Sequence, residues 1–142
     1  MNRPMEIEMP ITINGYDVDV MGIVNNIVYI RWFEDLRLQF LAKYYPYDEI
    51  VRSGRSPMLM KTEAEYKLPL TIYDKPIGRC WISNMGRLKW EMGYEIVSGE
   101  NIHCRGKQLG CFYDMNAKKV ARLPDKITGP YNEFNEAKDI MI

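Results

Sequence analysis

Residues 27–45 contain neither glycine nor proline, and Pro46 follows them directly. Asn25 and Asn26 precede this segment, and asparagine is a favoured N-cap residue. A proline cannot continue a helix, so Pro46 marks its end. The sequence therefore predicts one long helix over residues 27–45. Its first turns are apolar on most sides, so we expect this helix to be buried broadly and not along one stripe.

Apolar and polar residues alternate on both sides of this segment, which is the period of a β-strand. One strand is predicted before the helix, over residues 7–13, and four after it, over residues 58–68, 77–83, 88–96 and 102–113. This order indicates an α+β fold. The simplest arrangement is a five-stranded antiparallel sheet wrapped around the helix.

The chain has 142 residues, so we expect a single domain over residues 1–142. Its formal net charge is zero, which argues against nucleic acid as a partner. No apolar run approaches the roughly 20 residues of a membrane-spanning helix. The N-terminus carries Glu6 and Glu8 and has no apolar signal core. We therefore expect a cytoplasmic protein without a membrane partner.

The cysteine and histidine residues do not suggest a metal site. Cys80, Cys104 and Cys111 lack metal-like spacing, and we expect reduced thiols in the core. His103 is the only histidine, so a catalytic zinc ion is not expected, and a structural or surface role is predicted for His103. There is also no Gly-x-Ser-x-Gly motif, which leaves a serine hydrolase unsupported.

Residues 16–29 place carboxylates just before the predicted helix. The first N–H groups of a helix have no partner within it and attract anions. A carboxylate nearby can act as a general base or as a nucleophile. The residue types alone favour a structural interpretation, with Asp17 and Asp19 as turn formers, Gly22 as a turn glycine and Asn25 or Asn26 as a cap.

The spacing Asp19-x-x-Gly22-x-Val24-x-Asn26-x-x-Tyr29 resembles the signature of the 4-hydroxybenzoyl-CoA thioesterase family of hot-dog proteins. Weaker similarities extend over residues 7–127. They lie at Phe33-Glu34-x-x-Arg37, at Tyr66, Pro69 and Asp74, over residues 86–96, at Gly106-Lys107 with Phe112, Tyr113 and Asp114, and over residues 121–124. The resemblance implies a hot-dog fold that hydrolyses acyl thioesters.

The resemblance also implies roles for single residues. Asp19 falls on the catalytic carboxylate, as nucleophile or general base, and Gly22 on the glycine of the catalytic turn. Asn26 falls on the residue whose backbone N–H faces the thioester carbonyl. Tyr29 falls on a tyrosine that shapes the acyl pocket, to which we expect Trp32 to contribute as well. Some members have a histidine in place of Asn26, so a histidine-assisted mechanism there is excluded.

Other polar residues have predicted roles at or near the site. Lys89 stands where relatives more often have a small hydroxyl residue, and it is a candidate for the pocket wall or for a contact with CoA. Glu34 is predicted to pair with Arg37 or Arg31 because of their helical spacing, although another clade of hot-dog enzymes uses a helix carboxylate in catalysis. Asp17 is predicted to hold the turn.

The leading hypothesis is an acyl-CoA thioesterase that needs no cofactor, since coenzyme A is part of the substrate. An acyl-ACP thioesterase and a non-catalytic domain that binds acyl-CoA are the alternatives. Asp19 argues against the pure binder, which has no need of this carboxylate. A hot-dog dehydratase usually needs a histidine in the site, and His103 lies outside the motif. Because hot-dog relatives build their sites between two subunits, we expect a homodimer or a homotetramer.

Overall fold

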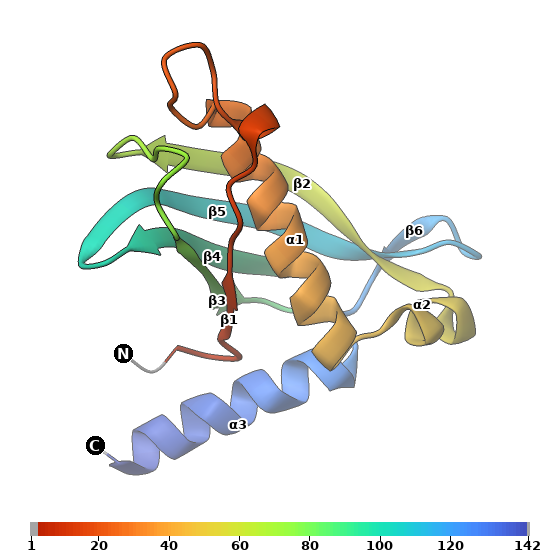
Figure 1. Cartoon of the computed structure of the whole chain (residues 1–142). Helices are drawn as coiled ribbons and strands as arrows, with labels where there is room; N and C mark the ends of the chain where they lie inside the picture. Colours follow the sequence, from red (N-terminus) through yellow and green to blue (C-terminus); the bar gives the residue numbers. More distant parts are fainter. Residues whose placement is uncertain (1–2, 142) are drawn as a thin grey trace.

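The computed structural model describes residues 3–141 and shows a curled antiparallel sheet around a long helix (Figure 1). The strands are β1 (Ile7–Pro10), β2 (Arg55–Tyr66), β3 (Ile77–Met85), β4 (Lys89–Ser98), β5 (Asn101–Asp114) and β6 (Lys119–Ala121). The helices are α1 (Asn26–Tyr44), α2 (Tyr47–Ser53) and α3 (Asp125–Met141), and a 3-10 turn spans Gly15–Asp17.

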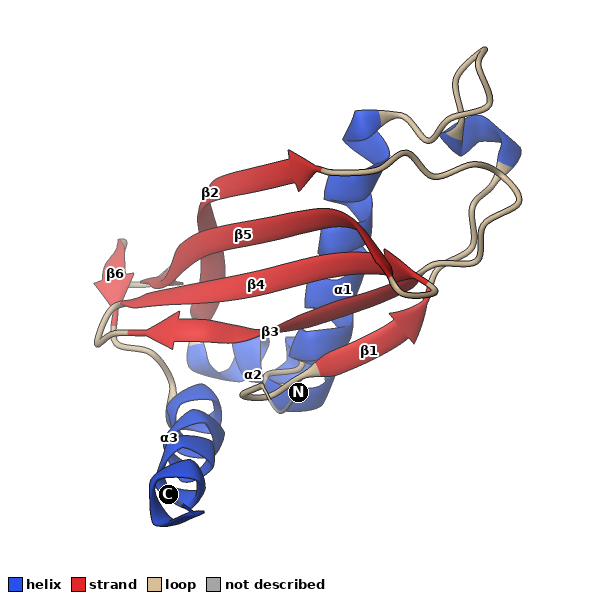
Figure 2. Ribbon diagram, turned by 90° about the vertical axis from the view of Figure 1, so that its left-hand side faces the viewer, coloured by secondary structure: helices blue, strands red, loops and turns tan. Residues whose placement is uncertain are grey.

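The strand order is β1-β3-β4-β5-β2, and all neighbours are antiparallel. The short strand β6 pairs with the C-terminal end of β5. Figure 2 shows α1 lying across one face of this sheet, whose other face carries no helix. The predicted five-stranded sheet around one long helix is thereby confirmed, with a short sixth strand added.

The helix α1 forms where the sequence predicts it. The Asn25 side chain caps it by accepting a hydrogen bond from the N–H of Ile27. Its inner face packs into the concave side of the sheet and contributes six buried residues: Val28, Tyr29, Trp32, Phe33, Leu36 and Phe40. On the sheet, Trp90, Met92, Tyr94 and Ile96 form the matching buried face of β4.

A glycine in β5 lets α1 approach the sheet closely. A Cβ atom at Gly106 would lie only 2.4 Å from the ring of Phe33. The same ring stacks on Tyr94, with 4.7 Å between the ring centroids. The absence of a side chain at Gly106 therefore makes room for the stacked pair at the centre of the core.

The predicted first strand over residues 7–13 is too long. The strand β1 ends at Pro10: the N–H of Ile11 still donates in register to the carbonyl of Pro76, 3.0 Å away, but Pro76 has no N–H with which to continue the ladder. Two further helices, α2 and α3, are not in the prediction. Gly129 and Pro130 obscure the helical pattern of α3, which is nevertheless helical and buries Ile127 in the core.

The edge strand β2 differs in detail from the prediction. It begins at Arg55 and includes Pro57, which is tolerated because β2 pairs with β5 alone. The register shifts between Leu59 and Lys61. This irregularity breaks the simple alternation predicted over residues 58–68, because an extra residue in one strand moves the following side chains to the opposite face.

The three cysteines are free and buried, as predicted. Burial raises the pKa of the Cys80 thiol to about 12, and that of the Cys104 thiol likewise to about 12. Within residues 3–141, no helix has the length and hydropathy needed to cross a membrane. The same residues hold no group of three or more histidine, cysteine and acidic side chains suited to a metal ion.

Candidate active site

A loop closed by backbone hydrogen bonds precedes α1. The N–H of Asn25 donates to the carbonyl of Asp17 over 2.9 Å, and Val18 forms a bridge with Val24. The Asp17 carboxylate is only 4% exposed and accepts the N–H of Asn14 at 2.8 Å. Asp17 thus holds the base of the loop, as predicted.

The Asp19 carboxylate lies on this loop and is exposed. One of its oxygens accepts the N–H groups of Met21, at 2.9 Å, and Ile23, at 3.2 Å. Gly22, between them, has φ of 75°, in the left-handed region that favours glycine. The loop therefore fixes the direction of the carboxylate by one oxygen, and no hydrogen bond within the described chain engages the other.

The start of α1 offers one backbone donor. The N–H groups of Asn25, Ile27 and Val28 are engaged, the last two by the side chain and carbonyl of Asn25. Among residues 3–141, no hydrogen bond is formed by the N–H of Asn26, the first residue of the helix. This donor stands at the positive end of the helix dipole, where a developing oxyanion is stabilised.

Aromatic side chains pack together at the first turns of α1. Tyr29 is 2% exposed, and its ring makes edge contacts with Trp32, at 5.2 Å, and Tyr66, at 5.4 Å. Burial raises the pKa of Tyr29 to about 12. The Tyr66 hydroxyl donates to the Asn26 carbonyl at 3.0 Å. The edge strand β2 is thereby linked to the first turn of α1.

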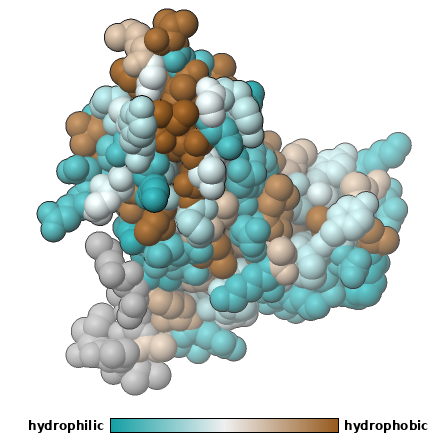
Figure 3. Space-filling model, in the orientation of Figure 1, coloured by the Kyte–Doolittle hydropathy of each residue, from teal (hydrophilic) through white to brown (hydrophobic). Residues whose placement is uncertain are grey.

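A surface hollow of about 570 Å³ lies between the N-terminal segment and α1. Its lining includes Val28 and Trp32 from the helix and Ile11 from the segment after β1. Figure 3 shows hydrophobic surface on the upper part of the molecule. The loop before α1 and the first turn of α1 expose the apolar residues Val20, Met21 and Ile27. Trp32 therefore lies beside a surface hollow that has both apolar and charged residues in its lining.

The predicted pair of Glu34 and Arg37 is confirmed, with 2.5 Å between Oε2 and Nη2. Arg37 also donates to Gln108, which is fully buried and accepts the Tyr94 hydroxyl at 2.5 Å. Gln108 donates in turn to Thr62 at 3.3 Å. These polar groups join α1 to β4, β5 and β2 inside the core.

The structure does not bring Lys89 to Asp19 within one chain. Lys89 pairs with Cys111, whereas Tyr66, beside the helix start, pairs with Cys104. At about 3.3 Å per residue these two positions of β5 lie roughly 23 Å apart. Lys89 therefore cannot line the pocket around Asp19 of its own chain.

His103 has the structural surroundings predicted for it. The side chain is 8% exposed, and Nδ1 lies 3.2 Å from the Leu68 carbonyl and 3.1 Å from that of Pro69. His103 thus ties the start of β5 to the connection that follows β2.

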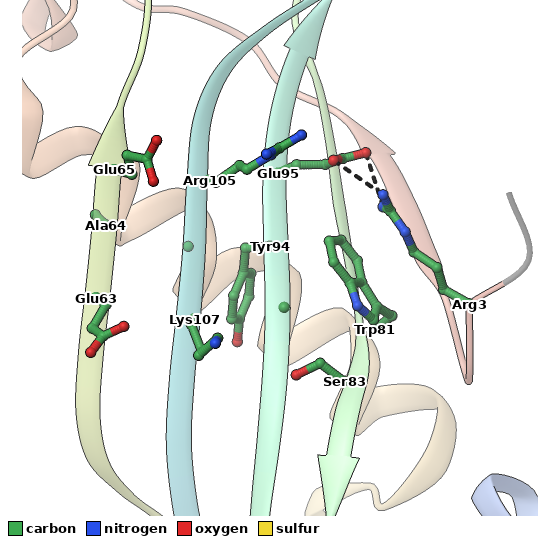
Figure 4. Close-up of a pocket in the computed structure, with 12 residues that line it drawn as sticks. Arg3, Glu63, Ala64, Glu65, Trp81, Ser83, Tyr94, Glu95, Arg105 and Lys107 are labelled. Carbon is green, nitrogen blue, oxygen red and sulfur yellow. Dashed lines mark hydrogen bonds and ion pairs between the residues drawn. The ribbon is translucent and has the colours of Figure 1, made fainter.

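A second hollow, of about 590 Å³, lies on the face of the sheet away from α1 (Figure 4). Trp81 lies over Gly93, and Arg3 stacks on its ring at 3.8 Å while binding Glu95 at 2.9 Å. Burial opposes ionisation of Glu95, but the hydrogen bonds from Arg3 and Arg79 outweigh it and keep the pKa of this carboxyl low. The charge of Glu95 is thereby compensated by Arg3 and Arg79 on this face of the sheet.

The sequence did not reveal Tyr66 or Gln108 as parts of the site region. Tyr66 resembles only a residue of the family's second strand, which implies no role at the site, and its bond to Asn26 spans 40 positions of the chain. Gln108 stands on the buried face of β5, where the alternation calls for an apolar residue. Because buried polar groups are normally hydrogen-bonded, a polar residue at such a position is the one sequence signal of a buried hydrogen-bond network.

The curled antiparallel sheet, the long helix in its concave face and the carboxylate loop at the helix start define a hot-dog protein of the thioesterase type. The model of the thioesterase-like superfamily matches residues 14–130, and the chain belongs to this family. Family membership supports the reaction class predicted from the motif, thioester hydrolysis.

Individual relatives agree with this assignment. A putative esterase of Aquifex aeolicus is 40% identical over 113 residues, 79% of this chain and 87% of the relative. An acyl-acyl carrier protein thioesterase of Arabidopsis thaliana is 24% identical over 93% of this chain and 70% of its own. The structure of a DHNA-CoA thioesterase from Staphylococcus aureus superposes with a TM-score of 0.80 at 20% identity, covering 96% of this chain and 95% of that one, which shows the shared fold.

Proposed function

We propose that this protein hydrolyses acyl-CoA thioesters to the free acid and CoA, with Asp19 as the catalytic carboxylate. The observation that carries the proposal is a carboxylate, that of Asp19, held by the loop that leads into α1, where the N–H of Asn26 has no partner among residues 3–141. The motif spacing from Asp19 to Tyr29 and the family membership support it.

The reaction follows from these two groups. The thioester carbonyl oxygen accepts the N–H of Asn26, and Asp19 either attacks the carbonyl carbon or takes a proton from an attacking water. Negative charge develops on the carbonyl oxygen, where a fixed donor typically contributes about 3–4 kcal/mol. The C–S bond then breaks, and the thiolate of CoA leaves. If Asp19 is the nucleophile, water hydrolyses the resulting anhydride.

The acyl group is proposed to lie against the aromatic residues at the helix start. Trp32 borders the hollow directly, while Tyr29 packs behind Trp32 and holds its ring. Gly22 keeps the loop in the turn that directs Asp19. An acyl-ACP is the second candidate substrate, since one relative bears the name of an acyl-acyl carrier protein thioesterase.

The test measures hydrolysis of a panel of acyl-CoA and acyl-ACP substrates by detecting the free thiol that each reaction releases. Turnover of acyl-CoA supports the proposal, and faster turnover of acyl-ACP favours the second substrate. Tight binding of acyl-CoA without any turnover of either substrate would reject the enzyme in favour of a binding domain.

Tyr66→Phe is expected to lower kcat about fivefold and to leave KM within about twofold. The variant removes the hydroxyl that holds the Asn26 carbonyl, and one such hydrogen bond contributes about 1 kcal/mol. Steady-state kinetics separate the two constants. Tyr73→Phe is the matched control, because Tyr73 lies in the next loop and is 90% exposed. An unchanged kcat in Tyr66→Phe would show that this bond does not position the Asn26 peptide.

We propose that the protein works as a homodimer or homotetramer. The edge strand β2 has 12 residues and one neighbour only, and α1 leaves Ile27 and Leu38 more than 60% exposed. An open edge and exposed apolar residues favour pairing of two chains. Light scattering should give two or four times the 16.7 kDa of one chain. A monomer at micromolar concentration would contradict this proposal.

A further inference from the structure

A third hollow, of about 360 Å³, lies at the end of the molecule opposite the Asp19 loop. It is formed by α2, the first residues of β2 and the segment that enters α3, which lie together beyond the C-terminal end of α1 (Figure 1). Four cationic side chains and two carboxylates line it: Arg52, Arg55, Arg122 and Lys126 with Glu49 and Asp125.

The charge of this hollow differs from that of the other two. Its lining has a net charge of +2, whereas the whole chain is neutral. The hollow beside α1 has one arginine against three carboxylates, a net charge of −2. The outer hollow has three cations against three carboxylates and is neutral. Of these three, only the hollow beside α2 attracts an anion.

Two arginines of this hollow are available to a ligand. Glu49 already binds Lys126, at 2.5 Å, and Arg52. For Arg55 and Arg122, the described part of the chain gives no ion pair. Guanidinium groups bind phosphate oxygens through two parallel hydrogen bonds, which a lysine cannot do.

The floor of the hollow holds Arg55 in a fixed place. The buried Tyr45 hydroxyl lies 2.6 Å from Ser53 Oγ and donates to the Arg55 carbonyl at 3.2 Å. The N–H of Arg55 donates to Ser53 Oγ at 3.1 Å. These bonds fix the position on the backbone from which the Arg55 side chain extends into the hollow.

We propose that this hollow binds the phosphate groups of a nucleotide bearing two or more phosphates, with Arg55 and Arg122 as its principal ligands. Such a nucleotide has two sources, the phosphorylated end of a CoA thioester or a free nucleotide that acts as an effector. Only the first source rests on the proposed thioesterase function. The length of α1, roughly 27 Å at 1.5 Å per residue, separates the hollow from Asp19.

Direct binding tests the site without any reference to catalysis. Adenosine 3′,5′-bisphosphate is titrated by calorimetry into the wild type, Arg55→Ala/Arg122→Ala and Lys75→Ala. Lys75 is exposed at the other end of the sheet, and its variant removes a positive charge away from the hollow. We expect binding to the wild type and to Lys75→Ala, and a loss of about tenfold or more in the double variant. Binding should also weaken with salt.

Two results would overturn the site: no binding of the probe to the folded wild type, or equal affinity in the double variant. Thermal unfolding checks that the variants fold. Arg55→Lys/Arg122→Lys serves as a second variant that keeps the charge but loses the paired hydrogen bonds, and its affinity should fall between those of the wild type and the alanine variant. Wild-type affinity in this lysine variant would contradict the assigned arginine geometry.

Kinetics then distinguish the two sources. If the hollow holds the end of the substrate, the double variant raises KM for acyl-CoA about tenfold, with kcat and the KM for acyl-pantetheine unchanged. If the hollow holds a free nucleotide, the double variant loses binding of the probe, while its KM for acyl-CoA equals that of the wild type. A wild type that binds the probe but hydrolyses no thioester would reject the proposed function and leave this site in place.

Discussion

Asp19→Asn is expected to lower kcat for acyl-CoA hydrolysis by about 10²- to 10⁴-fold, the usual contribution of a catalytic acid or base. The amide oxygen of asparagine can still accept the N–H groups of Met21 and Ile23, so the loop keeps its shape. An amide can neither attack the carbonyl carbon nor take a proton from water. The loss should therefore appear in kcat, with KM little changed.

The control for this variant is Asp48→Asn, which removes an exposed carboxylate from α2 and should leave kcat unchanged. Equal thermal stability of wild type and Asp19→Asn would exclude misfolding as the cause of a loss. Wild-type activity in Asp19→Asn would remove Asp19 as the catalyst. Glu34 is then the next carboxylate to replace, since it lies on α1 and is partly exposed.

Gly106→Ala is expected to lower the free energy of unfolding by about 1–3 kcal/mol, the typical cost of overpacking a core. The added Cβ atom would lie 2.4 Å from the ring of Phe33, which stacks on Tyr94 and cannot move without losing that contact. Urea denaturation measures the change as a shift in midpoint at constant slope.

Two further variants make the Gly106→Ala experiment specific. Gly15→Ala is the matched control, because nothing lies within 4 Å of its added Cβ atom, and its stability should be close to that of the wild type. Phe33→Leu should cost stability in the wild type but less in the Gly106→Ala background, since a smaller side chain relieves the overlap. Additive losses in the double variant would show that Phe33 is not the residue that Gly106 accommodates.

Local periodicity was sufficient to predict the long helix and the main strands. The boundaries of α1 and the Asn25 cap follow from neighbouring residues, as does the buried face of β4. The helix α3 was missed because its pattern is interrupted by Gly129 and Pro130, and packing of Ile127 against distant residues holds it in place. Tertiary contacts of this kind outweigh local propensity.

The candidate site was predictable where it is local in sequence. The buried turn role of Asp17, the exposed Asp19 and the glycine conformation at Gly22 all arise within one loop. The hydrogen bond from Tyr66 to Asn26 forms because β2 passes close to the start of α1. The local sequence pattern of neither segment predicts this proximity. The catalytic role of Asp19 itself stays a prediction for kinetics to test.

The irregular edge of β2 bears on how many chains can assemble. A long, straight edge strand is a template for indefinite strand addition, which leads to fibres. In β2, Pro57 offers no N–H, and the shift between Leu59 and Lys61 interrupts the ladder, so the edge is divided into residues 55–59, which contain the proline, and residues 61–66. The exposed charges of Lys61, Glu63 and Glu65 further restrict which strands can pair with the edge of β2. The edge is therefore suited to a closed, symmetric association of few copies and resists open-ended growth.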